Sequence, residues 1–96
     1  MSLDQYSNMA EAKRKAIKYL GKGTELKISD RKDKKYMLLD PSTQKMVYFG
    51  QMGYEDFTKH KDPERRKRYL DRATKIKGDW RKNKYSPNNL AINILW

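Results

Sequence analysis

Apolar residues recur at two different spacings along the chain, and the change of spacing divides it into helices and strands. Near the start they lie three and four residues apart, which is typical of one helix face. These residues are Met9, Ala12, Ala16, Ile17 and Leu20. Asn8 can cap this helix, with Glu11 in an imperfect capping box, and Gly21 or Gly23 can end it. We therefore expect a helix with that inward stripe, preceded by a frayed segment 1–7.

The next part of the chain has the pattern of three short strands joined by polar turns. Residues 24–29 alternate Leu26 and Ile28 with charged residues, which predicts a strand with one buried face. Residues 35–39 and 45–49 are the other two predicted strands. Within them 36–39 and 46–49 are apolar without alternation, so we expect both faces of this hairpin to be covered by the two helices or by a partner. Because the connections are short, sequential strands should pair as an antiparallel meander.

A loop with two glycines follows the third predicted strand. Gly50 and Gly53 are expected to turn the chain tightly, and Tyr54 and Phe57 to pack the loop back into the core. The spacing of the glycines invites comparison with the loop by which KH domains hold RNA. That loop joins two helices, whereas this one follows a strand, so a tight turn is the better interpretation.

The second predicted helix is strongly basic. Asp62 is suited to its N-cap, Pro63 to its first turn and Glu64 to the positive end of the helix dipole. Gly78 should end the helix just after Lys77. Its apolar stripe consists of Tyr69, Leu70, Ala73 and Ile76. Arginine and lysine occupy most of the remaining positions, so the helix should present a cationic outer surface.

The C-terminal segment is predicted to form a short helix that opens at Ser86 and Pro87, after a basic connector anchored by Trp80. Its apolar side would consist of Leu90, Ala91, Ile94 and Leu95. We thus expect an α+β fold in a single domain, residues 1–96. It would comprise an N-terminal helix, a three-stranded antiparallel meander, a long basic helix and a short C-terminal helix.

Composition limits the size of the core and the chemistry available. Hydrophobic and charged residues each make up 36% of the 96 residues, so we expect a modest core and marginal stability. The chain has no cysteine, which excludes disulfides and thiolate metal sites. No apolar run reaches the length of a membrane span, and the N-terminus lacks a signal-peptide core, so we expect a protein that is not secreted.

Positive charge is concentrated in the last third of the chain. Residues 61–96 hold 11 Lys and Arg against 4 Asp and Glu, which accounts for +7 of the net charge of +11. Such a distribution attracts polyanions, either nucleic acid or an acidic protein surface. Guanidinium groups match phosphate oxygens and stay charged. The predicted nucleic-acid contacts are Lys61, Arg65, Arg66, Arg68, Arg72, Lys75, Lys77, Arg81, Lys82 and Lys84.

Aromatic residues offer a second kind of contact, because bases stack on exposed rings. In so small a chain most of these rings are expected in the core, and Tyr48 and Trp80 are the predicted stacking positions. A solvated surface remains the alternative interpretation of the basic helix.

Catalytic patterns are weak. His60-Lys61-Asp62 repeats the letters of the phospholipase D motif without its spacing, and a single histidine cannot build a zinc site with other histidines or cysteines. A metal site made only of carboxylates would need Glu55, Asp56 and Asp62, which are better interpreted as loop charges or caps. We therefore predict no catalytic residue, no metal, no cofactor and no enzymatic activity.

The string FGQMGYEDFTKHKDPERRKRYLDR, residues 49–72, carries a resemblance together with Trp80 and the tail SPNNLAINILW. It is similar to a family of small uncharacterised proteins encoded by large DNA viruses of eukaryotes and by some phages. The likeness covers residues 35–96 and leaves out the first helix. It implies a viral origin, a place in the virion or the infected host cell, and no known catalytic mechanism.

Two functional hypotheses follow. The first is sequence-independent binding of nucleic acid, DNA rather than RNA, through the basic helix in association with a viral genome. The second is a minor structural protein of the virion that docks on acidic capsid or core proteins and uses the apolar tail 90–96 as a docking element. Pairing with a second copy through the hairpin edge or the terminal helix is compatible with either hypothesis.

Overall fold

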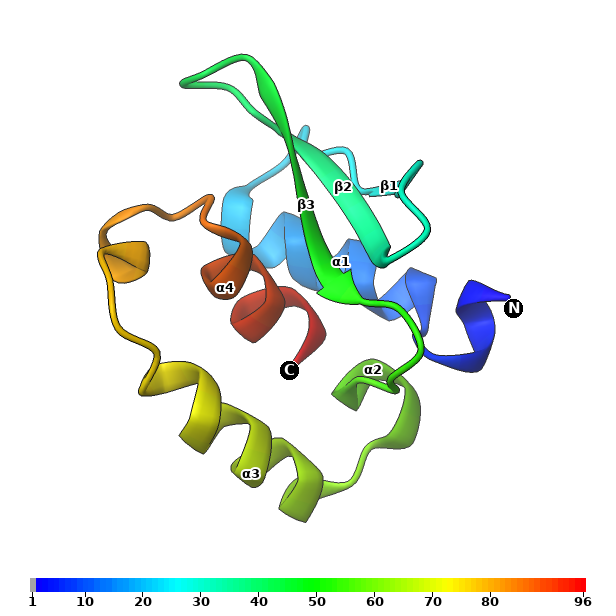
Figure 1. Ribbon diagram of the computed structural model, residues 1–96. Helices are drawn as coiled ribbons and strands as arrows, with labels where there is room; N and C mark the ends of the chain where they lie inside the picture. Colours follow the sequence, from blue (N-terminus) through cyan, green and yellow to red (C-terminus); the bar gives the residue numbers. More distant parts are fainter. Residues whose placement is uncertain (1) are drawn as a thin grey trace.

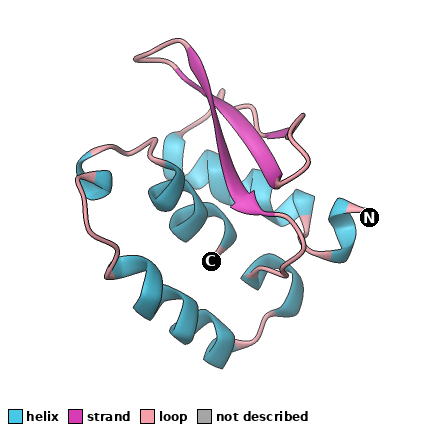
Figure 2. Ribbon diagram, viewed as in Figure 1, coloured by secondary structure: helices cyan, strands magenta, loops and turns pink. Residues whose placement is uncertain are grey.

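A computed structural model describes residues 2–96 and shows the predicted α+β fold (Figures 1 and 2). The helical elements are η1 (Leu3–Gln5), α1 (Met9–Leu20), α2 (Phe57–His60), α3 (Pro63–Thr74), η2 (Trp80–Lys82), α4 (Pro87–Leu90) and the π-helical η3 (Ala91–Leu95). The strands are β1 (Lys27–Ile28), β2 (Lys34–Asp40) and β3 (Lys45–Gln51). No helix in residues 2–96 is long and apolar enough to cross a bilayer.

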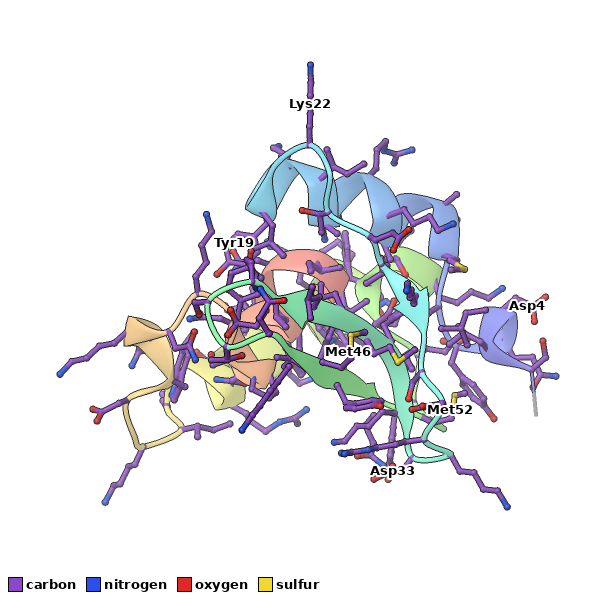
Figure 3. All side chains as sticks on the ribbon, turned by 90° about the horizontal axis from the view of Figure 1, so that it is seen from above. Asp4, Tyr19, Lys22, Asp33, Met46 and Met52 are labelled. Carbon is purple, nitrogen blue, oxygen red and sulfur yellow. The ribbon has the colours of Figure 1, made fainter. Side chains whose placement is uncertain are left out.

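The strands form the predicted antiparallel meander in the order β1-β2-β3. Tyr36 pairs with Phe49 across β2 and β3, and their rings lie 6.0 Å apart. At the open end of this hairpin the Met52 N–H donates to the Asp33 carbonyl at 3.0 Å, and both residues are labelled in Figure 3. The register therefore places two large aromatic side chains together on one face, where both are buried.

Strand β1 is shorter than the sequence predicts. The predicted segment 24–29 reduces to two paired residues, and Ile28 is 55% exposed, so the expectation of a buried Ile28 was wrong. Leu26 is buried, but it precedes the strand. On β2, Leu38 is buried and Leu39 is 46% exposed, so the second face of the hairpin is covered only in part. A run of apolar residues does not by itself tell which face a short, twisted hairpin buries.

Helix α1 follows the predicted caps closely. The Asn8 side chain accepts from the Glu11 N–H at 3.2 Å, and Gly21 ends the helix with a φ of 105°. Ala12 and Ala16 are completely buried, and their small side chains let η3 pack closely beside α1 (Figure 1). Ile17 is 45% exposed, which corrects its place in the inward stripe. It lies about 100° around the helix from Ala16 and so points away from the packed side.

The core is shared by α1, the sheet and the C-terminal helices. Its buried members are Ala12, Ala16, Leu26, Tyr36, Leu38, Phe49, Leu90, Ile94 and Leu95. Helix α4 begins as predicted at Ser86, whose hydroxyl accepts from the Asn89 N–H at 3.2 Å. Because Leu90, Ile94 and Leu95 are almost fully buried, the hypothesis that the tail 90–96 is a docking element was wrong. These side chains complete the protein's own core.

The N-terminal residues are more ordered than the predicted frayed segment. Leu3–Gln5 forms a 3-10 turn, and Ser7 is only 1% exposed. The Ser7 hydroxyl accepts from the Tyr36 hydroxyl at 2.7 Å and also lies 3.1 Å from that of Thr58. These bonds attach the start of the chain to the sheet and to α2. Met1 lies outside the described residues.

Helix α2 was not predicted from the sequence. It begins at Asp56, whose carboxylate accepts from the Thr58 N–H at 3.1 Å, and ends where Lys61 adopts a left-handed conformation. Phe57 is half-buried, but Tyr54 is 69% exposed, so the prediction that Tyr54 packs into the core was wrong. The extra helical turn redirects the chain outward before α3 begins.

Candidate nucleic-acid interface

Helix α3 lies at the periphery of the molecule and is held mainly by its C-terminal neighbours (Figure 1). Its one buried residue is Ala73. The Tyr69 ring stacks on Trp96 with centroids 4.1 Å apart and planes 10° apart. The Arg66 Nε donates to the Trp96 carbonyl at 2.8 Å, and the Asn88 side chain donates to the Ala73 carbonyl at 3.0 Å. The helix is thus fixed along one side and exposed along the rest.

The ends of α3 show where the sequence prediction holds and where it fails. The Asp62 carboxylate accepts from the N–H groups of Glu64 and Arg65, at 3.0 and 3.4 Å, with Pro63 in the first turn as predicted. The helix ends at Thr74 rather than Lys77. Ile76 therefore lies beyond the helix and is 52% exposed, which removes it from the predicted apolar stripe.

A groove of about 610 Å³ separates α3 from the end of β3 and from the C-terminal helices. One wall carries Arg65, Arg68 and Arg72. Tyr69 lies between these arginines in the sequence, and Ile76 follows them. The lining also includes apolar side chains from the C-terminal segment: Pro87, Ala91, Leu95 and Trp96. The remaining wall comes from β2, from the end of β3 and from the loop that follows it, including Gly50 and Tyr54. The groove thus combines cations with an apolar lining.

We call the three arginines of this wall the arginine lip. They differ in whether their side chains have a partner in the fold. Arg65 forms an ion pair with Glu55 at 3.1 Å, and both side chains are well exposed. Within residues 2–96, the side chains of Arg68 and Arg72 have no hydrogen-bond or ion-pair partner. They also line a second, shallower hollow of about 270 Å³ with Asp71 and Lys75. The predicted cations 65, 68, 72 and 75 are therefore brought together on one surface.

Other predicted contact residues have different partners in the fold. Arg66 is bonded to Trp96 and lies over the Phe57 ring. Arg81 donates to the Thr74 carbonyl, and Lys61 pairs with Glu11 of α1.

The remaining cations of the connector lie away from the groove lining. The Lys84 ammonium lies 5.2 Å from the centroid of the Tyr19 ring, on α1, and the Tyr19 hydroxyl donates to the Lys84 carbonyl. Lys77 and Lys82 are exposed, and the Lys82 ammonium lies 3.9 Å from the Asp79 carboxylate. The structure therefore divides the predicted set into cations at the lip, of which Arg68 and Arg72 are free within residues 2–96, cations that contact other parts of the fold, and exposed lysines such as Lys77 that do neither.

The two predicted stacking rings already have cationic neighbours. The Arg31 guanidinium lies 3.9 Å from the centroid of the Tyr48 ring, and Arg81 lies 4.4 Å from that of Trp80. The Trp80 Nε1 also donates to the Ile76 carbonyl at 2.7 Å. Tyr54 is the exposed ring that lines the groove, and the sequence analysis missed it. Its position between Gly53 and the two acidic residues Glu55 and Asp56 was the available signal.

Comparison with known protein families adds one finding. The model of a family described as a family of unknown function, DUF5754, matches residues 24–73. The chain belongs to this family. No curated protein and no solved structure matches it significantly. The matched part of this DUF5754 protein runs from the first strand region to α3, so it includes the arginine lip but not the C-terminal segment that packs against it.

Beneath the groove lies a buried ion pair that the sequence analysis did not identify. The Lys35 ammonium is 3.1 Å from the Asp56 carboxylate, and the two side chains are 3% and 1% exposed. Burial lowers the pKa of Lys35, although the carboxylate beside it acts in the opposite direction. Taking both charges out of water is costly, so the pair is not expected to be a large source of stability. It is better interpreted as an ion pair that fixes the position of α2.

The three carboxylates that a metal site would need in this DUF5754 protein have other roles. Asp56 caps α2 and pairs with Lys35, Asp62 caps α3, and Glu55 pairs with Arg65. No group of three His, Asp or Glu side chains in residues 2–96 is arranged to hold a metal ion.

Gly50 is required by packing at the groove. Its φ is 82°, and a Cβ atom built there would lie 2.8 Å from the Leu95 Cδ1. A side chain at this position would be strained by the positive φ and would have to displace the Leu95 side chain. Gly50 thus lies within β3 rather than in the predicted turn, and this close approach explains the glycine without any role in clamping RNA.

Proposed function

We propose that the protein binds nucleic acid without catalysis, through sequence-independent contacts between phosphates and the arginine lip of α3. The observation that carries this proposal is the pair Arg68 and Arg72, which face a groove and lack partners within residues 2–96. Unpaired guanidinium groups can form bidentate bonds with phosphate oxygens without first breaking an internal ion pair. DNA is the proposed polymer.

The surroundings of the lip support a phosphate partner. Lys75 adds a further positive charge beside Arg68 and Arg72, and Asp71 is the acidic side chain among the residues lining the second hollow. The whole chain carries a net charge of +11, which would draw polyanions from a distance. Because α3 buries only Ala73, its outer surface can contact a partner without disturbing the core.

The test is the affinity for a DNA duplex of about 20 base pairs as a function of salt concentration. With about four phosphate contacts, the slope of log affinity against log salt should be roughly −3 to −4. The double variant Arg68→Glu and Arg72→Glu should lose most of this binding. Its matched control is Lys13→Glu with Arg14→Glu, which makes the same change of net charge on exposed positions of α1.

A large loss in the α3 variant and a small loss in the α1 variant would support the lip as the binding surface. Equal losses would show that binding follows net charge alone, and the proposed site would be abandoned. No binding even at low salt would remove the function itself. The acidic virion proteins of the second hypothesis would then be the partners to test, with α3 rather than the buried tail as the contact.

The viral setting is part of the proposal and stems from the resemblance of residues 35–96. It is tested separately by fractionating particles from infected cells. A genome-associated protein should be found with the nucleic acid after the shell is removed. Its recovery with the shell would favour the structural hypothesis instead.

A further inference from the structure

We propose that the groove beside α3 accepts an unpaired base, so that the protein binds single-stranded nucleic acid in preference to duplex. This inference rests on the proposed function and deepens it by naming the form of the polymer. It concerns the apolar part of the groove, which phosphate contacts alone do not use.

The groove has the size and lining for such a ligand. Its volume of about 610 Å³ falls within the range of small-molecule sites, and its lining is largely apolar side chains and aliphatic stems below a cationic lip. A duplex keeps its bases stacked and paired, and so presents chiefly phosphates to a basic helix. A single strand can place a base against Tyr54, Ile76 and Pro87, the exposed apolar residues of the lining, while its backbone stays at the lip.

The exposed side chains at the groove favour a flat, apolar occupant. Tyr54 is 69% exposed and Ile76 is 52% exposed, and they come from the segments after β3 and after α3. Within residues 2–96 the Tyr54 ring has no aromatic or cationic neighbour, whereas Tyr48, Tyr69 and Trp80 each have one. Tyr54 is thus the exposed tyrosine whose ring faces remain available for stacking at this groove.

The spacing of the free arginines fits a strand that passes along the lip. Arg68 and Arg72 are one helical turn apart, so their Cβ atoms are about 5–6 Å from each other on the same side of α3. They can therefore contact successive phosphates of one strand on either side of the inserted base. The positive charge of the arginine lip favours a polyanion in this groove, which argues against an apolar peptide as its occupant.

The experiment compares two probes with the full chain at one salt concentration: an oligothymidine of about 12 nucleotides and a duplex of the same length. The single strand should bind about tenfold more tightly, as expected for one stacked base. Tyr54→Ala should remove this preference by weakening single-strand binding about tenfold and leaving duplex binding unchanged. Tyr54→Phe should keep the preference, because the ring rather than the hydroxyl makes the contact.

Tyr48→Ala is the matched control, because it removes a tyrosine that lies outside the groove and is covered by Arg31. It should leave the preference intact. Running oligouridine beside oligothymidine identifies whether the base comes from RNA or DNA.

Equal binding of single strand and duplex, or a preference that survives Tyr54→Ala, would overturn the inference and leave the proposed function standing. A preference lost in Tyr48→Ala instead would place the base on the sheet, which also overturns it. Self-association without DNA that is lost in Tyr54→Ala would show that a second copy fills the groove. Failure of both probes to bind would remove the proposed function, a result distinct from all of these.

Discussion

Helix α3 and the C-terminal helices α4 and η3 are neighbours, but α3 is mostly exposed and the C-terminal helices are mostly buried. Helix α3 spans twelve residues and buries one, Ala73, whereas α4 and η3 together bury Leu90, Ala91, Ile94 and Leu95. They touch through the Tyr69–Trp96 stack and two hydrogen bonds to carbonyl groups. Since the C-terminal helices already fill the core beside α1 and β3, α3 is left on the surface.

This difference explains how a small chain carries so much positive charge without losing its fold. Self-repulsion is least costly where the charges face water, and α3 with its C-cap places Arg68, Arg72 and Lys75 there. The core depends instead on an apolar segment with no charged residue between Pro87 and Trp96. The comparison predicts that stability and binding reside in different helices and can be changed separately.

The largest expected effect is a difference in stability between variants of two isoleucines. Ile94→Ala in η3 should lower the free energy of unfolding by about 2–5 kcal/mol, because Ile94 is completely buried. Ile76→Ala beside α3 should change it by no more than about 0.5 kcal/mol, because Ile76 is half exposed. Urea denaturation followed by circular dichroism measures both. Similar losses for the two variants would show that α3 contributes to the core as much as the C-terminal helices do.

A smaller effect compares two helix caps. Asp62→Ala should lower the free energy of unfolding by about 1 kcal/mol, because the Asp62 carboxylate accepts from two N–H groups at the start of α3. Hydrogen exchange should show the loss confined to α3, since that helix can open without exposing the core. Ser86→Ala removes a cap of α4 that also donates to the Trp80 carbonyl at 2.8 Å. Its effect should extend to the sheet and α1, and an effect confined to α4 would contradict this separation.

The smallest expected effect is a pH dependence at the junction of α2 and α3. The His60 Nδ1 accepts from the Asp62 N–H at 2.9 Å, and the ring lies 5.2 Å from that of Trp96. Burial lowers the pKa of His60, with Arg65 acting in the same direction, so the unfolded chain takes up this proton first as the pH falls. Stability should therefore be full above about pH 6.5 and decrease below it.

The measurement is the urea midpoint between about pH 7.5 and pH 5.5, a range in which ordinary carboxylates stay ionised. Protection against hydrogen exchange at the start of α3, corrected for the slower intrinsic exchange at low pH, should decrease as the pH falls, because a protonated Nδ1 can no longer accept from the Asp62 N–H. His60→Asn is the control and should flatten the response. A slope that persists in that variant would assign the pH dependence to other groups.

Local signals in the sequence were sufficient for the helix starts and the meander. Asn8, Asp62 and Ser86 each cap a helix at the predicted position, since a cap is a hydrogen bond between residues two or three apart. The short turns likewise determine which strands pair. The helix over Phe57–His60 was missed because four residues give no measurable periodicity.

The candidate site was predictable only as a group of cations. Sequence identified the arginines of α3, but it could not distinguish Arg66, which is bonded to Trp96, from Arg68 and Arg72, which are free within the described residues. Nor did the local sequence indicate that Tyr54 stays exposed or that Lys35 is buried. For Arg66 and Lys35 the partner, Trp96 or Asp56, lies far away in the chain.

By itself, the amino-acid sequence of this protein determined the helix caps, the strand order and the concentration of positive charge in residues 61–96. Those properties depend on neighbours along the chain. Only the tertiary structure decided that Leu90, Ile94 and Leu95 fill the core while Ile17, Ile28 and Ile76 stay exposed. The apolar patterns of these segments look alike, but the interior has a limited volume. The C-terminal segment, which packs closely against Ala12, Ala16 and Gly50, occupies that volume.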